Sequence, residues 1–219
     1  MLPQRRRTTF AVSGALFLCG AVAAWAVDAS TLAQVRKIDA TTPRDVQIAI
    51  AVSAGPPISD KATVYVLGPQ GYEVARQGTN GFSCLVERQP IDTVAPVCYD
   101  AEGTATLIPV DEFIERERAR GRADADIAKA VTEGYRTGQF KAPRKGGIAY
   151  MLSDYNWLVD PKTKKMNHFP GHLMFYAPNA TADDVGHGPG APILTDPGQP
   201  DNFLVVVPAA SHHAGGDHQ

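Results

Sequence analysis

Cysteine is scarce in this chain, and so are long apolar runs and runs of like charge. The 219 residues contain three cysteines, and no apolar run after residues 10–23 is long enough to cross a bilayer. The 21 basic and 23 acidic side chains are scattered and give a formal net charge of −2. Such a chain does not present the basic surface that attracts nucleic acids or anionic membranes. We therefore expect neither of these partners.

The common catalytic motifs are missing as well. The chain has no Walker phosphate loop, no dinucleotide-binding glycine pattern and no H-E-x-x-H zinc motif. Residues 81–85 (Gly-Phe-Ser-Cys-Leu) begin like the nucleophile elbow of a hydrolase but end in leucine, where that motif has glycine. We therefore interpret Ser83 as an ordinary strand residue, and the sequence favours a protein without catalysis.

The first residues have the three parts of a secretory signal peptide. Arginines at positions 5–7 precede the apolar run, and Ala-Trp-Ala at 24–26 places small residues at both positions that a signal peptidase reads. We predict a signal peptide at 1–26 and a periplasmic or extracellular location, with no membrane span after cleavage. An uncleaved anchor is the alternative, because about 18 uncharged residues are the minimum for a spanning helix.

Signal cleavage also simplifies the cysteine count. It removes Cys19 and leaves Cys84 and Cys98 in a compartment where disulfides persist. A bridge between them would close a loop worth roughly 3 kcal/mol. A redox pair is the alternative, but the spacing lacks the C-x-x-C pattern of oxidoreductases. We predict a structural disulfide.

The pattern of apolar residues indicates an α+β fold. Pro43 and the apolar stripe after it predict an N-terminal helix that ends before Gly55, and two further helices are expected around Ile114 and from Asp124 to Gly138. Strands are expected at 63–67, 72–75, 82–86, 96–100, 148–152, 156–159, 165–169, 172–176 and 203–207. Strands, then a helical pair, then strands predict a mainly antiparallel sheet.

These elements fit a single domain. We place the domain at 42–208, after a flexible leader at 27–41 and before a disordered tail at 209–219 that contains histidines. The mature chain of about 190 residues is long enough to bury one complete core.

The candidate metal site is formed by histidines in the last third of the chain. His168 and His172 flank a Phe-Pro-Gly segment that could fold the two imidazoles together. His187, or a carboxylate such as Asp154 or Asp160, could complete three ligands around a divalent metal, with an open position for water. The alternative is that each histidine simply bonds to backbone at a strand end.

A second candidate site lies just before these histidines. Asp154, Tyr155 and Trp157 combine polar and aromatic groups at a strand connection, as the linings of small-ligand clefts do. The same residue types also close hairpins, so both interpretations stay open.

Four landmark motifs carry a resemblance to a known family. They are residues 78–84 (GTNGFSC), 96–100 (PVCYD), 147–152 (GIAYML) and 171–176 (GHLMFY). In this order the chain resembles a family of uncharacterised exported bacterial proteins, other members of which often have tryptophan at the position of Phe82. The resemblance implies one exported domain and no known activity. It favours His172 over His168 as a site residue, because only His172 lies inside a landmark.

Three functions remain as hypotheses. The first is a non-catalytic binding or accessory protein with a small-molecule or metal site near His172 and no cofactor. The second is a metal-assisted hydrolase that uses His168, His172 and a third ligand. The third is a structural component of the cell envelope, with an envelope protein as its partner.

Overall fold

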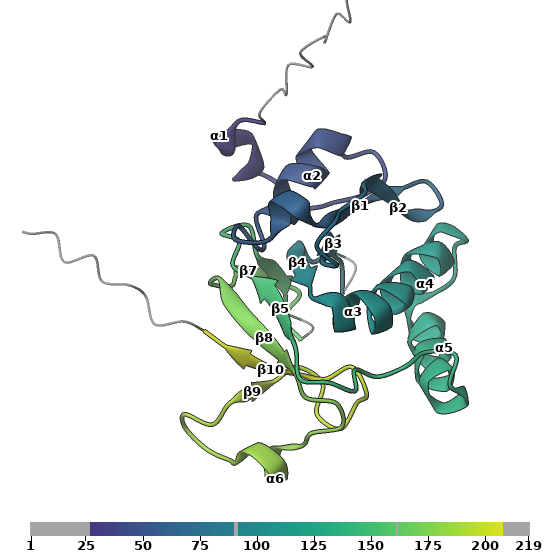
Figure 1. Cartoon of the computed structure of the whole chain (residues 1–219), viewed down its shortest axis with the longest axis vertical. Helices are drawn as coiled ribbons and strands as arrows, with labels where there is room; N and C mark the ends of the chain where they lie inside the picture. The colour runs from purple at the N-terminus through teal and green to yellow at the C-terminus, as the bar shows by residue number, and fades with distance from the viewer. Residues whose placement is uncertain (1–26, 90–91, 161, 208–219) are drawn as a thin grey trace, which may run out of the picture.

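The computed structural model describes residues 27–89, 92–160 and 162–207. The predicted signal peptide with Cys19, and the predicted tail, lie outside these residues. Seven of the nine predicted strands lie in one eight-stranded sheet with the order β2-β1-β3-β4-β5-β8-β10-β9 (Figure 1). Its strands are β1 Thr63–Gly68, β2 Gly71–Arg76, β3 Ser83–Glu87, β4 Ala95–Tyr99, β5 Ile148–Met151, β8 His172–Tyr176, β9 Ile193–Leu194 and β10 Phe203–Val206.

Strand pairing is antiparallel throughout this sheet except between β1 and β3, which run parallel. A separate antiparallel hairpin joins β6 (Trp157–Val159) to β7 (Met166–His168). The helices are α1 Ala29–Leu32, α2 Arg44–Val52, α3 Ala101–Thr106, α4 Ile108–Ala119, α5 Asp124–Thr137 and α6 Ala182–Val185, with a 3₁₀ turn at Ser59–Lys61. The predicted α+β class, with a mainly antiparallel sheet, is confirmed.

Helices cover the two faces of the sheet separately, because successive side chains of a strand point to opposite faces. Cys84 and Val86 of β3 pack with Ile50 on the face that α1 and α2 cover. Leu85 of the same strand packs with Leu107 on the face covered by α3 and α4. Figure 1 shows α2 and α4 on the two sides of the sheet. The second face also carries the candidate site.

The segment predicted as a flexible leader packs onto the domain. It forms α1, and Leu32 and Ile38 are only 7% and 1% exposed in the core beneath α2. The polar residues of 27–41 suggested a loose chain, but these two apolar side chains fix it. The packed domain therefore begins before residue 42. Within the described residues, no helix is long and apolar enough to cross a membrane.

Asp100 connects three of the four landmark segments of this chain. Its carboxylate caps α3 by accepting from the Gly103 amide at 3.0 Å, and it also accepts from the Ile148 amide at 2.9 Å. The Tyr176 hydroxyl donates to the same carboxylate at 2.8 Å. A Cβ on Gly147 would overlap both Asp100 and Tyr176. These landmarks therefore join β4, β5 and β8 and build the sheet.

The predicted disulfide is present and buried. Cys84 and Cys98 are directly opposite each other on β3 and β4, and both are fully buried beneath α2. The bridge therefore connects two central strands of the sheet.

Replacing both cysteines by alanine is expected to lower the free energy of unfolding by about 3 kcal/mol, because the unfolded chain loses a closed loop. Urea denaturation of the oxidised protein and of the Cys84→Ala/Cys98→Ala variant measures this difference. A reducing agent should destabilise the wild type and leave the variant unchanged. Equal midpoints for the oxidised and reduced wild type would contradict the prediction.

Candidate functional site

His172 lies at the start of β8, buried on the face of the sheet that α3 and α4 cover. Its side chain bonds to backbone: Nδ1–H donates to the Pro170 carbonyl at 2.9 Å, and the Phe169 ring lies 4.8 Å away, edge to face. Burial lowers the pKa of His172, and the bond to Pro170 only partly opposes this effect. The imidazole is therefore neutral at pH 7, with Nε2 as its acceptor nitrogen.

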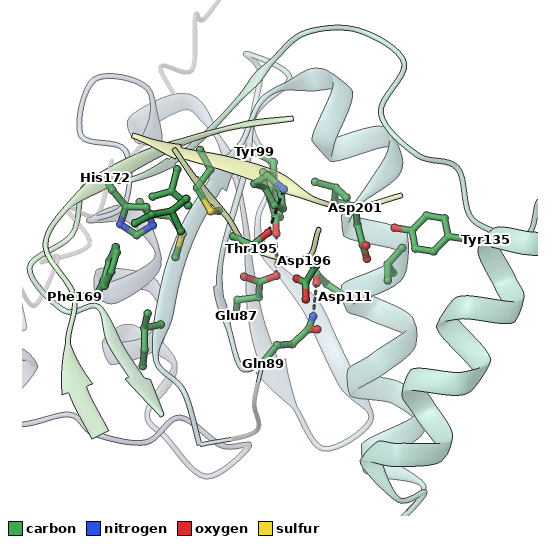
Figure 2. Close-up of a pocket in the computed structure, with 18 residues that line it drawn as sticks. Glu87, Gln89, Tyr99, Asp111, Tyr135, Phe169, His172, Thr195, Asp196 and Asp201 are labelled. Carbon is green, nitrogen blue, oxygen red and sulfur yellow. Dashed lines mark hydrogen bonds between the residues drawn. The ribbon is translucent and has the colours of Figure 1, made fainter. Parts of the chain in front are cut away.

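A pocket of about 300 Å³ opens beside His172, within the size range of small-molecule sites (Figure 2). Much of its wall is apolar and comes from β5, β8, β9, β10, the β6–β7 hairpin and its end, and the start of α4. The apolar lining residues are Leu107, Val110, Met151, Leu158, Phe169, Met174, Ile193, Phe203 and Val205.

The opposite end of the pocket is acidic. Four carboxylates line it: Glu87 at the end of β3, Asp111 in α4, and Asp196 and Asp201 in the loop between β9 and β10. Figure 2 shows these side chains gathered together, with His172 and Phe169 grouped at the other end. The pocket therefore has an apolar half and a negatively charged half.

Glu87 is held as a weak acid at this acidic end. The Tyr99 hydroxyl donates to its Oε1 at 3.1 Å, and the Asp111 carboxyl lines the same end of the pocket. Burial raises the pKa of Glu87 to about 7, the hydrogen bond from Tyr99 opposes this rise, and the charges of Asp201 and Asp196 add to it. Glu87 therefore exchanges its proton near neutral pH.

Asp111 is the most deeply buried carboxylate of the pocket, at 4% exposure. Gln89 Nε2 donates to its Oδ1 at 3.3 Å, whereas Oδ2 accepts no hydrogen bond from any described residue. Burial raises the pKa of Asp111 well above its usual range, and the charges of Glu87 and Glu115 raise it further. An ionised carboxylate here would be left with a buried oxygen that lacks a donor.

The acidic end opens towards α5. A second hollow of about 440 Å³ shares four lining residues with the pocket: Gln89, Tyr135, Asp196 and Asp201. The Tyr135 hydroxyl points towards the Asp201 carboxylate (Figure 2). Burial raises the pKa of Asp201 as well. This hollow gives a route from the protein surface to the carboxylates.

The predicted patch around Trp157 lies outside the pocket. Asp154 accepts through its carbonyl from His168 Nε2 at 2.9 Å, and the Trp157 and His168 rings are 5.1 Å apart. The Arg36 guanidinium lies 3.6 Å from the centre of the Trp157 ring, and Tyr155 packs against the core beneath α2. These side chains therefore hold the β6–β7 hairpin against the segment before α2.

The predicted histidine cluster does not form. His168 is exposed on β7, and His187 is exposed beside α6, where its Nε2 pairs with Asp183 at 2.8 Å. In the described part of the chain, no group of three or more histidine, cysteine or acidic residues is arranged to hold a metal ion. The Pro-Gly step does not fold His168 back, since it turns the chain from the hairpin into the main sheet. Of the predicted site residues, His172 alone lines the pocket.

Two signals in the sequence point to the acidic residues that our sequence analysis missed. Glu87 follows Leu85 by two residues, so both side chains point to the same, core-facing side of β3. Asp111 follows Leu107 by four residues and precedes Ile114 by three, so it lies in the apolar stripe of α4. A carboxylate at a core-facing position indicates either a partner or a site.

Comparison of the chain with protein-family models, with curated proteins and with solved structures finds no match. What the chain does is therefore inferred from the residues of the pocket. They combine a volume suited to a small molecule, an apolar wall and carboxylates with raised pKa values, which together are typical of functional sites.

Proposed function

We propose that this chain is exported and acts, in the periplasm or outside the cell, as a non-catalytic binding protein whose pocket beside His172 holds a small organic molecule. The observation that carries the proposal is the pocket of about 300 Å³ with one apolar and one acidic end. A hollow of this kind costs packing energy, so a sheet protein with a purely structural role gains nothing from it. The disulfide and the basic, then apolar, first residues support export.

The rival function, metal-assisted hydrolysis at His168 and His172, has less support. His168 is exposed on the β6–β7 hairpin, whereas His172 is buried and donates to Pro170. The third hypothesis, a structural envelope component, would be favoured by co-purification with a stable envelope partner. Turnover of esterase, phosphatase or peptidase substrates that is abolished by Glu87→Gln would instead establish an enzyme.

A pocket-filling substitution tests the binding function. We expect the neutral apolar dye N-phenyl-1-naphthylamine to bind at one saturable site with a rise in fluorescence. Val205→Trp places an indole in the pocket and should weaken dye binding by about tenfold or more. Leu204→Trp is the matched control, because Leu204 neighbours Val205 on β10 but faces the other side of the sheet.

The control variant should bind the dye as the wild type does. Dye binding that does not saturate, or that Val205→Trp leaves unchanged, would contradict the proposed function. Circular dichroism of both variants verifies that the indole at position 205 has not unfolded the sheet.

A further inference from the structure

The pocket has a strong charge asymmetry. Its lining residues include four carboxylates and neither lysine nor arginine among the described residues. The arginines of the adjoining positions have other partners: Arg88 and Arg118 both bind Glu115, and Arg118 also binds Asp124 at 2.8 Å. The negative end of the pocket is therefore not neutralised by a cation of the lining.

A proton provides part of this neutralisation. Glu87 and Asp111 line the same end of the pocket, and burial together with the charge of Glu87 raises the pKa of Asp111, so the pair retains a proton near neutral pH. The other donors to this pair are neutral: the Tyr99 hydroxyl reaches Glu87, and the Gln89 amide reaches Asp111. Asp111 Oδ2 has no donor among the described residues, although Asp111 is only 4% exposed. A ligand that brings positively charged N–H groups would supply what this oxygen lacks.

The apolar half defines the rest of such a ligand. The side chains of Met151, Met174, Phe203 and Val205 surround a space that suits an alkyl or aryl group. Sulfur and aromatic walls also adapt to flat ring systems. A charged head and an apolar body thus match the two ends of the pocket in Figure 2.

We propose that the pocket binds an organic ammonium ion, a protonated amine with an aryl or alkyl body, and that the ammonium group replaces the proton shared by Glu87 and Asp111. This inference rests on the proposed binding function and names its ligand class. The exchange is balanced: the protonated protein takes up R–NH₃⁺ and releases one H⁺ to solvent. The N–H groups of the ammonium then donate to Asp111 Oδ2 and to Glu87.

The proton exchange makes binding depend on pH. The groups that act electrostatically on the pair are Tyr99 on β4, Glu115 on α4, and Asp196 and Asp201 in the β9–β10 loop, with Tyr72 of β2 and Arg88 close by. Glu115 is neutralised by its two arginines, and the tyrosine hydroxyls stay protonated. Affinity for the amine should therefore rise from about pH 5.5 to about pH 8, as the shared proton becomes easier to remove.

Calorimetry with a matched pair of probes tests the inference. The probes are 2-phenylethylamine and its neutral analogue 2-phenylethanol, each also used to displace N-phenyl-1-naphthylamine. We expect the amine to bind the purified protein at least about tenfold more tightly than the alcohol. Titrations in two buffers with different ionisation enthalpies should show proton release with the amine and none with the alcohol.

Variants of the pair separate a role in ligand binding from a role in folding. Asp111→Asn and Glu87→Gln should each weaken the amine by about tenfold or more while dye binding persists. Glu112→Gln, at the neighbour of Asp111 on α4 that does not line the pocket, should change neither amine binding nor dye binding.

If the alcohol binds as tightly as the amine while the dye is displaced, the ammonium inference is overturned and the binding function stands. If amine affinity is unchanged in Asp111→Asn, or no proton is released, the inference is also overturned. Failure of the dye itself to bind would overturn the proposed function.

Discussion

Replacing Glu115 by glutamine is expected to lower the free energy of unfolding by about 3–5 kcal/mol, the usual cost of breaking a buried ion pair. Glu115 is 3% exposed and ion-pairs with both Arg88 and Arg118, whose side chains are 8% and 10% exposed. Removing its charge leaves the buried Arg88 guanidinium without a carboxylate partner and leaves Arg118 with Asp124 alone. Chemical denaturation at neutral pH measures the loss.

An exposed ion pair gives the matched control. Glu133 and Arg136 are neighbours on α5, with side chains 56% and 71% exposed, so Glu133→Gln should cost less than about 1 kcal/mol. A loss for Glu115→Gln no greater than that for Glu133→Gln would show that the buried network contributes nothing to stability.

The Glu115 network also matters for the pocket. Arg88 follows Glu87 in the chain, and it donates to the Ile38 carbonyl at 3.0 Å as well as to Glu115. Arg118 donates to the Arg88 carbonyl at 2.8 Å. These bonds fix α4 against the end of β3, so they determine how closely Asp111 approaches Glu87. Loss of the network should therefore disturb the carboxyl pair along with the fold.

Much of the fold could be predicted from local patterns. The alternation in β3 placed Cys84 on one face of a strand, and a following strand that contains Cys98 made a cross-strand disulfide the simplest arrangement. The apolar stripe that begins near Asp124 and the glycine at 138 defined α5, which ends at Thr137 with Gly138 in the left-handed region. Such signals act over a few residues, so a single sequence contains them.

The order of the strands and the site could not be predicted in this way. β3 pairs in parallel with β1 through a crossover. β5 pairs with β8, and β8 with β10, although about 20 or more residues separate the strands of each pair in the sequence. The same holds for the pocket, in which Glu87, Asp111 and Asp201 come from three separate elements. The two histidines that are close in sequence, His168 and His172, lie on different sheets.

Glu87→Gln is expected to stabilise the protein by about 3 kcal/mol near pH 8, because the variant no longer has to ionise a buried acid. The pKa of Glu87 rises from 4.5 to about 7 on folding, and each pKa unit corresponds to about 1.4 kcal/mol. A raised pKa contributes stability that is complete below about pH 4.5 and is lost as the pH rises through about 7. The gain from the variant should therefore be large at pH 8 and small near pH 5, as urea denaturation at several pH values would show.

Two comparisons make this result specific. His172 acts in the opposite direction, since burial lowers its pKa and its contribution falls as the pH drops below about 6.5, but it is present in both proteins and cancels in the difference. Glu133→Gln on α5 is the control: the hydrogen bond from Arg136 lowers the pKa of this exposed carboxyl, so the variant should show no gain in stability near pH 8. A Glu87→Gln protein that is less stable than the wild type near pH 8 would mean that Glu87 is ionised and held by a cation. The expected gain instead identifies a carboxyl pair that weakens the folded state, as residues maintained for binding commonly do.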